Sequence, residues 1–585
     1  MTVSYQDMNE AIGQNWYAID PNLAQVFARL AEPEDLAWCE EKLSIVGALM
    51  GDRIARNAER IDKDPARLVR WDRDGNEINQ VVHSEHALDS KRALWKHNVI
   101  HLQTADEVTS RGRPCPAPLP VAYLYLLSQA DTGMLCSVGM TSGVLRLVER
   151  FGDQKTKDVF VPKLRNNDFD AGWHGSMYLT EKQGGSDLGV TETVAAKTDQ
   201  GWTLRGFKWF CSNVDGDAII ALARPEGNPP GIKGLGLFIV PRTLEDGRQN
   251  GIQIRRIKDK LGTRSVPTGE VDFVDALAYP LASDGTPEDG RGINRMMAFV
   301  NQSRLGVAAM GAGIMRRVFV EAAIRTHHRR AFGQPLCEHP MVREQLIDLL
   351  CESEAAATLL FESASRTPDD PLVPIGEGDP LARILVPLTK MRCTRGGVVS
   401  ASQGLELFGG NGFIENWPMA RQYRDAQCHT LWEGTENVLA LDVLRTLSLG
   451  EVRDALLDRL QSCISGAEDD LLSSAKRAVA DAVGRLTEDM LRVARGGQDA
   501  ALLHARHLAN DLADVVQCAL TLEEAQWELT HRGTAHKAVV VNWLARSHFE
   551  PRARWHEANA FIVRELFHPL VRYEGMSPET VADAV

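Results

Sequence analysis

The sequence predicts a mainly helical protein with a β domain in the middle and an additional helical region at the end. Three observations predict this fold class. Apolar residues recur three and four positions apart up to about residue 170 and again from about residue 286. Between these regions, short alternating segments are separated by loops rich in glycine and proline. The order of helices, then strands, then helices indicates segregated layers rather than alternating βαβ units.

The changes in pattern divide the chain into four regions. They are an N-terminal helical domain (1–170), a middle β domain (171–285), a C-terminal helical bundle (286–449) and an additional helical domain (450–585). Residues 33–61 and 292–330 both have helical character, which predicts long helices. In the β domain, the polar turn Asp199-Gln200-Gly201 between two alternating segments predicts a hairpin. Several such short strands favour a small antiparallel sandwich or barrel.

Composition and charge are those of an ordinary globular protein. Apolar residues make up 44% of the 585 residues and charged residues 25%. The net charge of −14 argues against a broad basic face for nucleic acid. The first residues lack the basic start and apolar run of a signal peptide, and no stretch approaches the roughly 20 apolar residues of a membrane span. We therefore expect a cytoplasmic protein without a membrane span.

The sequence carries no pattern for a metal site or a disulfide framework. The ten cysteines are scattered and form no C-x-x-C pair, which fits a reducing compartment. His327 and His328 are adjacent, so on a helix their side chains would point about 100° apart and make a poor metal pair. No G-x-G-x-x-G follows a strand, and no P-loop or H-E-x-x-H occurs. We expect no metal and no Rossmann nucleotide site.

Three stretches combine residues that suit a bound heterocycle or anion. In Met177–Gly189, a strand expected to end at Thr180 is followed by a glycine-rich turn whose N–H groups can form an anion site. In Gly206–Asn213, two aromatic residues precede a cysteine and a serine, which suits stacking plus a hydrogen bond. In Leu405–Phe413, glycines let the backbone approach another group closely. Taken singly, a tight loop, a sheet core and a helix C-cap are plainer explanations.

Glu433 stands between Trp432 and Gly434, directly before a segment with helical spacing. A carboxylate there can simply favour a helix N-terminus. It can also act as a base, because a dry site beside Trp432 would raise its pKa and strengthen it. Gly434 lets the chain turn, and Thr435 can cap the following helix. The other motifs decide between these two interpretations.

In their order and spacing, five stretches resemble the motifs of the acyl-CoA dehydrogenase family of flavoproteins. They read LTEKQGGSD from Leu179, GFKWFCSN from Gly206, RRAFGQPL from Arg329, LELFGGNGF from Leu405 and YRDAQCHTLWEGTENV from Tyr423. The resemblance covers roughly residues 1–449. It is closest to the AidB-like (adaptive-response flavoprotein) branch, whose members have a helical extension after the dehydrogenase core. The implied fold has N-terminal helices, a β sandwich or barrel and a C-terminal four-helix bundle.

The resemblance implies that FAD binds between the β domain and the C-terminal helices. Residues matched to the flavin side of the β domain are Leu179, Thr180, Gly185 and Ser186, with Phe210 and Ser212 against the ring. Residues matched to the FAD of a neighbouring subunit are Arg329, Phe332, Gly409 and Gly410, and those near the base are Thr435 and Asn437. A shared site implies a homo-oligomer, either a tetramer or a dimer. Glu406 and Lys182 depart from the family's usual glutamine and proline.

The resemblance also implies a reaction. Glu433 would abstract the α-proton of an acyl-CoA thioester while flavin N5 accepts the β-hydride. The backbone N–H of the base and the flavin ribityl 2′-hydroxyl would hold the thioester oxygen. Substrate contacts are expected from Ser186, Arg304 and Trp432, and electrons would pass to an electron-transfer flavoprotein. Ser303 occupies the position that carries the base in some other members, so that alternative base is absent.

A second function class stays open: a DNA-associated, alkylation-protecting flavoprotein with only marginal dehydrogenase activity. Binding to double-stranded DNA depends on Lys and Arg side chains that neutralise phosphates. Residues 451–585 hold 15 Lys and Arg against 21 Asp and Glu. This acidic balance disfavours nucleic-acid binding and favours the enzyme, with the extension as a cover or a subunit contact.

Overall fold

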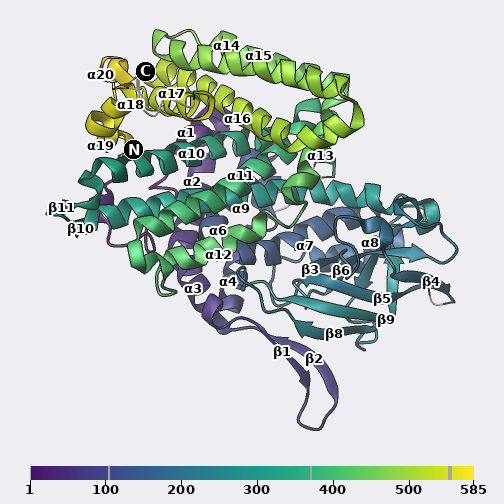
Figure 1. The fold of residues 1–585 in the computed structure, drawn as a ribbon. Coiled ribbons are helices and arrows are strands. Elements are labelled where there is room, and N and C mark those ends of the chain that lie inside the picture. The colour runs from purple at the N-terminus through teal and green to yellow at the C-terminus, as the bar shows by residue number, and fades with distance from the viewer. Residues whose placement is uncertain are drawn as a thin grey trace.

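The computed structural model describes residues 2–102, 106–199, 201–368, 370, 372–550 and 557–584 (Figure 1). Helices from both ends of the chain share one large apolar core, and the sheet domain lies beside it. The predicted fold class, with helices, a β domain, a helical bundle and further helices, is confirmed. All ten cysteines are free. Among the described residues, no helix combines the length and apolar character that crossing a membrane requires.

The N-terminal region is built from helices whose starts are set by capping residues. They are α1 (Pro21–Leu30), α2 (Pro33–Leu49), α3 (Ala55–Lys63), α4 (Glu85–Lys96), α5 (Asp106–Thr109), α6 (Pro118–Ala130), α7 (Thr132–Phe151) and α8 (Gln154–Leu164). Asp20 accepts a hydrogen bond from the Leu23 N–H at the start of α1, and Asp131 accepts one from the Met134 N–H in α7. Asp131 also accepts a hydrogen bond from Ser265 of the β domain, which ties α7 to that domain.

A two-stranded hairpin interrupts these helices, and the helical spacing did not predict it. β1 (Arg67–Trp71) pairs antiparallel with β2 (Glu77–Val82), and the hairpin projects away from the body of the molecule (Figure 1). Its turn contains the Asp74-Gly75 pair, with Gly75 at φ +84°, a conformation that glycine adopts without strain. This Asp-Gly pair is the local sequence signal for a hairpin.

The middle domain is a seven-stranded sheet. Its strands are β3 (Gly175–Tyr178), β4 (Val194–Thr198), β5 (Gly201–Ser212), β6 (Ala218–Pro225), β7 (Gly236–Pro241), β8 (Ile252–Ile257) and β9 (Thr268–Pro280). The strand order is β3-β5-β4-β6-β7-β9-β8, and the additional pairs β3–β6 and β5–β9 bend the sheet toward a barrel. β4 and β5 form the predicted hairpin, with Thr198 opposite Gly201.

Two details of this domain differ from the prediction. Most strand pairs are antiparallel, but β6 runs parallel to both β3 and β4. β3 ends at Tyr178 rather than at Thr180, because the backbone after it turns into the glycine-rich loop and the Thr180 carbonyl accepts a hydrogen bond from the Trp209 N–H instead. The early end of β3 leaves the loop free to lie open at the edge of the sheet.

The C-terminal bundle is packed around one long helix, α9 (Gly292–His328). The other elements are the short pair β10 (Arg330–Ala331) and β11 (Gln334–Pro335), and the helices α10 (Pro340–Ser365), α11 (Pro380–Leu407), α12 (Pro418–His429) and α13 (Glu436–Leu447). α9 approaches α11 closely, because a Cβ at Gly311 of α9 would overlap the Cys393 carbonyl oxygen of α11. This close contact fixes the two helices whose side chains meet at the candidate site.

The extension forms a further helical layer across α10 and α11 (Figure 1). It comprises α14 (Gly450–Gly466), α15 (Ser473–Arg495), α16 (Gly497–Arg532), α17 (His536–Phe549), α18 (Glu557–Phe561), α19 (Phe567–Val571) and α20 (Pro578–Val581). Glu352 of α10 lies 2.8 Å from Arg392 of α11 and 2.9 Å from His548 of α17. Lys537 of α17 lies 3.0 Å from Glu354 of α10. The extension is thus joined to the bundle by ion pairs as well as by apolar packing.

The ion pairs of Glu352 predict how stability depends on pH. Burial acts to raise the pKa of Glu352, but Arg392 and His548 lower it from 4.5 to about 2. Burial acts to lower the pKa of His548, but Glu352 raises it above 6.5. Glu352 therefore contributes stability that is lost as the pH falls below 4.5 toward 2, and His548 contributes stability that is lost as the pH rises above 6.5 through its folded pKa.

We expect His548→Gln to lower the thermal midpoint most at pH 5 to 6.5, where both contributions are present, and least at high pH. Thermal unfolding followed across pH measures this. His531→Gln is the control, because His531 of the same extension is exposed and contacts Trp527, through its carbonyl and its ring, rather than an acid. An equal loss at every pH for His548→Gln would contradict the linkage.

Candidate active site

Glu433 lies in a tight turn between α12, which ends at His429, and α13, which begins at Glu436. Its φ is +55°, and the following Gly434 has φ +97°. A non-glycine residue in this region costs roughly 1–3 kcal/mol and persists only where its surroundings enforce it. Backbone strain of this kind is concentrated at functional sites, which makes the Glu433 carboxylate a functional candidate.

Two buried cations enforce this turn from two different helices. Arg304 of α9 donates from Nε to the Glu433 carbonyl oxygen at 3.4 Å, and Lys390 of α11 donates from Nζ to the Gly434 carbonyl oxygen at 2.6 Å. Both side chains are buried. Two consecutive carbonyls are thereby held in fixed directions, and they are the first two after the Cα that carries the Glu433 side chain. The sequence motifs indicated Arg304 but not Lys390.

Arg304 is itself held by a carboxylate. Its Nη1 lies 2.7 Å from one oxygen of Asp442 in α13, and the other oxygen lies 2.6 Å from Arg383 of α11. Burial acts to raise the pKa of Asp442, but Arg383 and Arg304 hold it below its usual value. The ionised Asp442 therefore fixes Arg304 beneath the turn, where its hydrogen bonds go to protein groups.

The Glu433 carboxyl group is partly buried, and its surroundings act on its pKa in opposite directions. Burial raises the pKa of Glu433, whereas the nearby Ser303 hydroxyl and the charges of Arg304 and Lys390 lower it, and the net shift is upward. A carboxylate with a raised pKa is a stronger base than an ordinary carboxylate. The upward shift expected for this position is confirmed.

The aromatic residue beside the base packs on a buried histidine. The rings of Trp432 and His429 are stacked, with centroids 5.6 Å apart and an interplanar angle of 27°. Burial lowers the pKa of His429 to about 3, so its imidazole is uncharged at neutral pH. His429 therefore adds no charge near the base and acts as a flat support for Trp432.

The β domain reaches the same region through the loop between β8 and β9. The Thr263 N–H donates to Asp425 of α12 at 2.6 Å, and a Cβ at Gly262 would overlap the backbone of α12. On α7, burial raises the pKa of the Cys136 thiol to about 12, and the charge of Glu433 contributes to that shift. Elements of the N-terminal region, the sheet and the bundle therefore meet around the Glu433 turn.

The glycine-rich loop after β3 is anchored by a buried acid. Glu181 accepts hydrogen bonds from the Glu192 N–H at 2.7 Å and from Lys208 Nζ at 2.6 Å. The intervening loop, which contains Gly185 and Ser186, is exposed. The predicted flavin-side residues of this segment are Leu179, Thr180, Gly185 and Ser186, and the first two directly follow the end of β3.

The other two predicted ring contacts lie on β5. Phe210 is 53% exposed, which is unusual for a phenylalanine on a sheet. The Ser212 hydroxyl lies 3.1 Å from the Thr268 hydroxyl of β9. An exposed aromatic face beside an open glycine-rich loop fits a flat heterocycle such as a flavin ring.

Four predicted cofactor residues lie far from Glu433 in the same chain. They are Arg329, Phe332, Gly409 and Gly410. Arg329 follows the end of α9, 25 residues after Arg304, which corresponds to about 37 Å along a helix. Phe332 is 97% exposed, and a Cβ at Gly409 or Gly410 would meet nothing within 4 Å. The structure does not bring these residues to the turn, and their open surroundings leave room for groups from outside the chain.

The two predicted residues next to the base lie at the start of α13. Thr435 is the residue before the helix, as expected for a cap, but its side chain makes no capping hydrogen bond. Asn437 lines a groove of about 470 Å³ between α13 and α16, together with residues that include Leu441, Leu502 and Arg506. The sequence analysis did not predict that the extension forms one wall of this groove.

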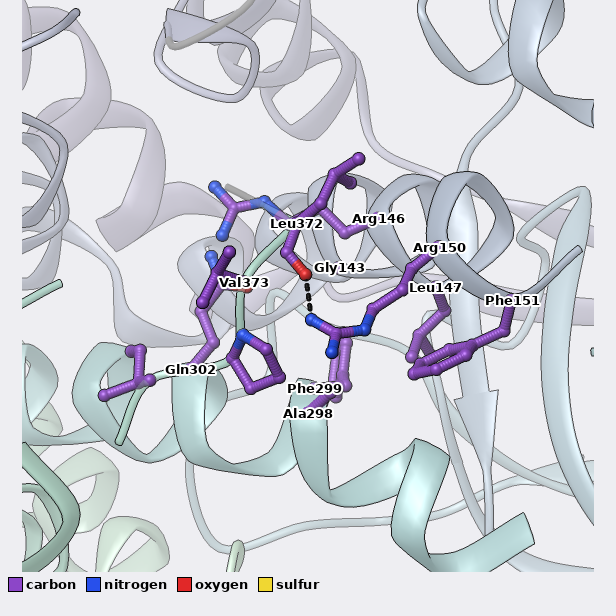
Figure 2. Close-up of a pocket in the computed structure, with 12 residues that line it drawn as sticks. Gly143, Arg146, Leu147, Arg150, Phe151, Ala298, Phe299, Gln302, Leu372 and Val373 are labelled. Atoms are coloured by element: carbon purple, nitrogen blue, oxygen red, sulfur yellow. Dashed lines mark hydrogen bonds between the residues drawn. The ribbon is translucent and has the colours of Figure 1, made fainter. Parts of the chain in front are cut away.

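A small cavity lies where α7 passes the start of α9 (Figure 2). Phe299 of α9 packs against Gly143 of α7, where a Cβ would overlap the ring. Arg150 donates to the Leu372 carbonyl oxygen across the cavity. The cavity volume of about 30 Å³ leaves room for about one water-sized group. Phe299 lies about one helical turn before Ser303 on α9. The cavity is therefore located on the N-terminal side of Ser303 along this helix.

Comparisons with known proteins agree with this arrangement. Three family models match consecutive parts of the chain: the adaptive response protein AidB N-terminal domain over residues 7–171, the acyl-CoA dehydrogenase middle domain over 176–276 and the acyl-CoA dehydrogenase C-terminal domain over 290–448. AidB of Escherichia coli is 30% identical over 448 residues, which cover 74% of this chain and 78% of AidB. The chain belongs to the acyl-CoA dehydrogenase family. The resemblance carried by the five motifs is confirmed.

Some solved structures resemble this acyl-CoA dehydrogenase family member over nearly its whole length, including the helical extension. Caenorhabditis elegans ACDH-11 in complex with C11-CoA has a TM-score of 0.84 at 27% identity and covers 95% of this chain and 96% of that chain. An acyl-CoA dehydrogenase of Bacillus anthracis complexed with FAD has a TM-score of 0.70 at 18% identity, covers 95% of both chains and shows a common fold. Because both comparisons cover 95% of this chain, the helices after α13 belong to a recurring architecture.

We expect Asp442→Asn to destabilise the protein by roughly 2–4 kcal/mol, because it leaves two buried or half-buried guanidinium groups without their ionised partner. Urea denaturation measures the loss. Asp454→Asn is the matched control, since its ion pair with Arg453 is solvent-exposed and should contribute under about 1 kcal/mol. Equal stabilities of the two variants would show that Asp442 does not anchor Arg304.

Proposed function

We propose that this protein oxidises the α,β carbon–carbon bond of an acyl-CoA thioester, with Glu433 as the base. The observation that carries the proposal is the turn that bears the Glu433 carboxyl group of raised pKa, whose backbone carbonyls are held by Arg304 and Lys390. An efficient base has a pKa near the working pH, and an upward shift moves a carboxyl group in that direction. The relative crystallised with C11-CoA supports an acyl-CoA substrate.

The cofactor of this proposal is FAD, held between the β domain and the bundle. Phe210 and Ser212 of β5 and the exposed loop with Gly185 and Ser186 would hold its ring side. Asn437 would contact it from the groove at the start of α13. When bound, FAD supplies an acceptor for the hydride that leaves the β-carbon. The exposed aromatic face fits this group, and family membership together with the FAD-bound relative of the same fold supports it.

The groups of the chain itself handle the proton and the thioester. The Glu433 N–H donates to no acceptor among the described residues, so it can donate to the thioester oxygen and acidify the α-carbon. The Glu433 carboxylate then takes the α-proton, and the electron pair of that bond stays on the substrate. Before this transfer, the positive charges of Arg304 and Lys390 favour the ionised carboxylate.

The proposal extends to an electron acceptor and to an assembly. Electrons would pass to an electron-transfer flavoprotein, as the family resemblance implies. The working form would be a homo-oligomer, since Arg329, Phe332, Gly409 and Gly410 are exposed and far from the Glu433 of their own chain. DNA protection is not proposed, because the chain has a net charge of −14 and its extension is acidic.

We expect the purified protein to be yellow and its oxidised-flavin absorbance to bleach when an acyl-CoA is added without oxygen. A panel that varies in chain length and branching, with free CoA as the control, measures the effect and its specificity. A folded but colourless protein that takes up no added FAD would refute the cofactor. A yellow protein that no acyl-CoA bleaches would refute the reaction.

Glu433→Gln should keep FAD but bleach about 10²–10⁴-fold more slowly than the wild type, because the amide cannot accept the proton. Stopped-flow absorbance with the best acyl-CoA of the panel gives the rate. Glu415→Gln is the control, since that carboxylate is exposed and pairs with Arg424. A Glu433→Gln rate close to that of the wild type would remove Glu433 from the mechanism.

A further inference from the structure

Lys390 is a buried cation that bonds to a backbone carbonyl rather than to an acid. It lies on α11 with none of its surface exposed, and its Nζ lies 2.6 Å from the Gly434 oxygen. The equally buried Lys208 and Lys537 each have a glutamate within 3.0 Å. Among the described residues, Lys390 has no such ion pair. Because burying an ammonium group is costly, its position needs another explanation.

The hydrogen bond of Lys390 acts on the strained part of the turn. Glu433 has φ +55°, which a residue with a side chain holds only with support, and it is followed by Gly434 at φ +97°, which glycine adopts without strain. Arg304 supports the Glu433 carbonyl from α9, and Lys390 supports the next carbonyl from α11. The direction of the Gly434 carbonyl decides how the chain enters α13, and with it where the Glu433 carboxylate points.

We propose that Lys390 is a positioning residue for Glu433, holding the turn through the Gly434 carbonyl and stabilising the ionised carboxylate by its charge. This role rests on the proposed function of Glu433 as the base. Lys390 would thus contribute to the base in two ways that can be tested separately. Its hydrogen bond orients Glu433, and its charge keeps the carboxylate ionised.

The charged and titratable groups around Lys390 and Glu433 determine how removal of the lysine changes the pKa of Glu433. Those that face Lys390 are Glu433, Arg304, Cys428, His429 and Glu436. Those that face Glu433 are Ser303, Arg304, Lys390 and Cys136. Burial lowers the pKa of Lys390 to about 8, so the side chain is charged at neutral pH. While charged, it lowers the pKa of Glu433, and its removal therefore raises that pKa.

The test follows removal of the α-proton without hydride transfer. The probe is the β-thia analogue of C11-CoA, in which sulfur replaces the β-carbon, and mass spectrometry measures deuterium entering its α-carbon in D₂O. In Lys390→Met we expect the midpoint of the acidic limb to move up by about one pH unit. The plateau exchange rate should fall roughly 10- to 100-fold, because the base is misdirected. The KM for the probe should change little.

Lys390→Gln separates the two contributions, because its amide can still donate to the Gly434 carbonyl but carries no charge. We expect the same upward shift of the midpoint as in Lys390→Met and a smaller loss of plateau rate. Lys476→Met is the matched control: Lys476 donates to the Ala467 carbonyl at 2.7 Å in the extension, and its loss should leave both quantities unchanged. Thermal midpoints and bound FAD show that each variant is folded.

The exchange measurements distinguish a failure of the Lys390 role from a failure of the proposed function. A folded Lys390→Met with the wild-type midpoint and plateau rate would overturn the role of Lys390. If Lys390→Met does not fold, Lys390→Gln decides, and a wild-type midpoint in that variant would overturn the role equally. Absence of exchange in the wild type would refute the proposed function itself, and this role with it. Exchange in the wild type together with unchanged variants would refute only the inference about Lys390.

Discussion

The close packing of α9 against α11 is the constraint on which the candidate site depends. Gly311 lets the two backbones approach, and this approach places Arg304 and Lys390 beneath the same turn. A turn with a glutamate at φ +55° would otherwise relax. The site is therefore a product of helix packing: the carboxylate belongs to one segment, and the groups that aim it belong to two others.

The extension takes part in the same packing. Its α17 forms ion pairs with α10, and α10 in turn pairs with α11, the helix that carries Lys390. α16 also forms one wall of the groove at the start of α13. A segment that follows the family core in the sequence is thus continuous with it in space. Loss of the extension would expose apolar and ionic surfaces of the bundle rather than free an independent unit.

Local sequence patterns predicted the fold class and the residues of the motifs, because helical spacing and short glycine-containing stretches are read within a few positions. Glu433 attracted attention through its neighbours Trp432 and Gly434, and the resemblance of the five motifs to the family assigned it as the base. Lys390 was not predicted, because one more cation on a helix that also carries Arg383 and Arg392 forms no pattern, and its role depends on a carbonyl 44 residues away in the chain.

The β1–β2 hairpin was missed for a different reason. Its Asp74-Gly75 signal lies between helical segments, and the helical interpretation of the region prevailed over one dipeptide. The groove beside Asn437 is lined by residues of α13 and α16 that lie more than 60 positions apart in the sequence, and no local pattern reports such a contact. Burial around the Glu433 turn also affects three neighbouring side chains, His429, Cys136 and Cys428. It keeps the His429 imidazole neutral and raises the pKa of both thiols, so none of the three carries charge at neutral pH. Alkylating reagents that attack thiolates should therefore react slowly beside the base, and rapid inactivation by such a reagent would report modification elsewhere on the protein.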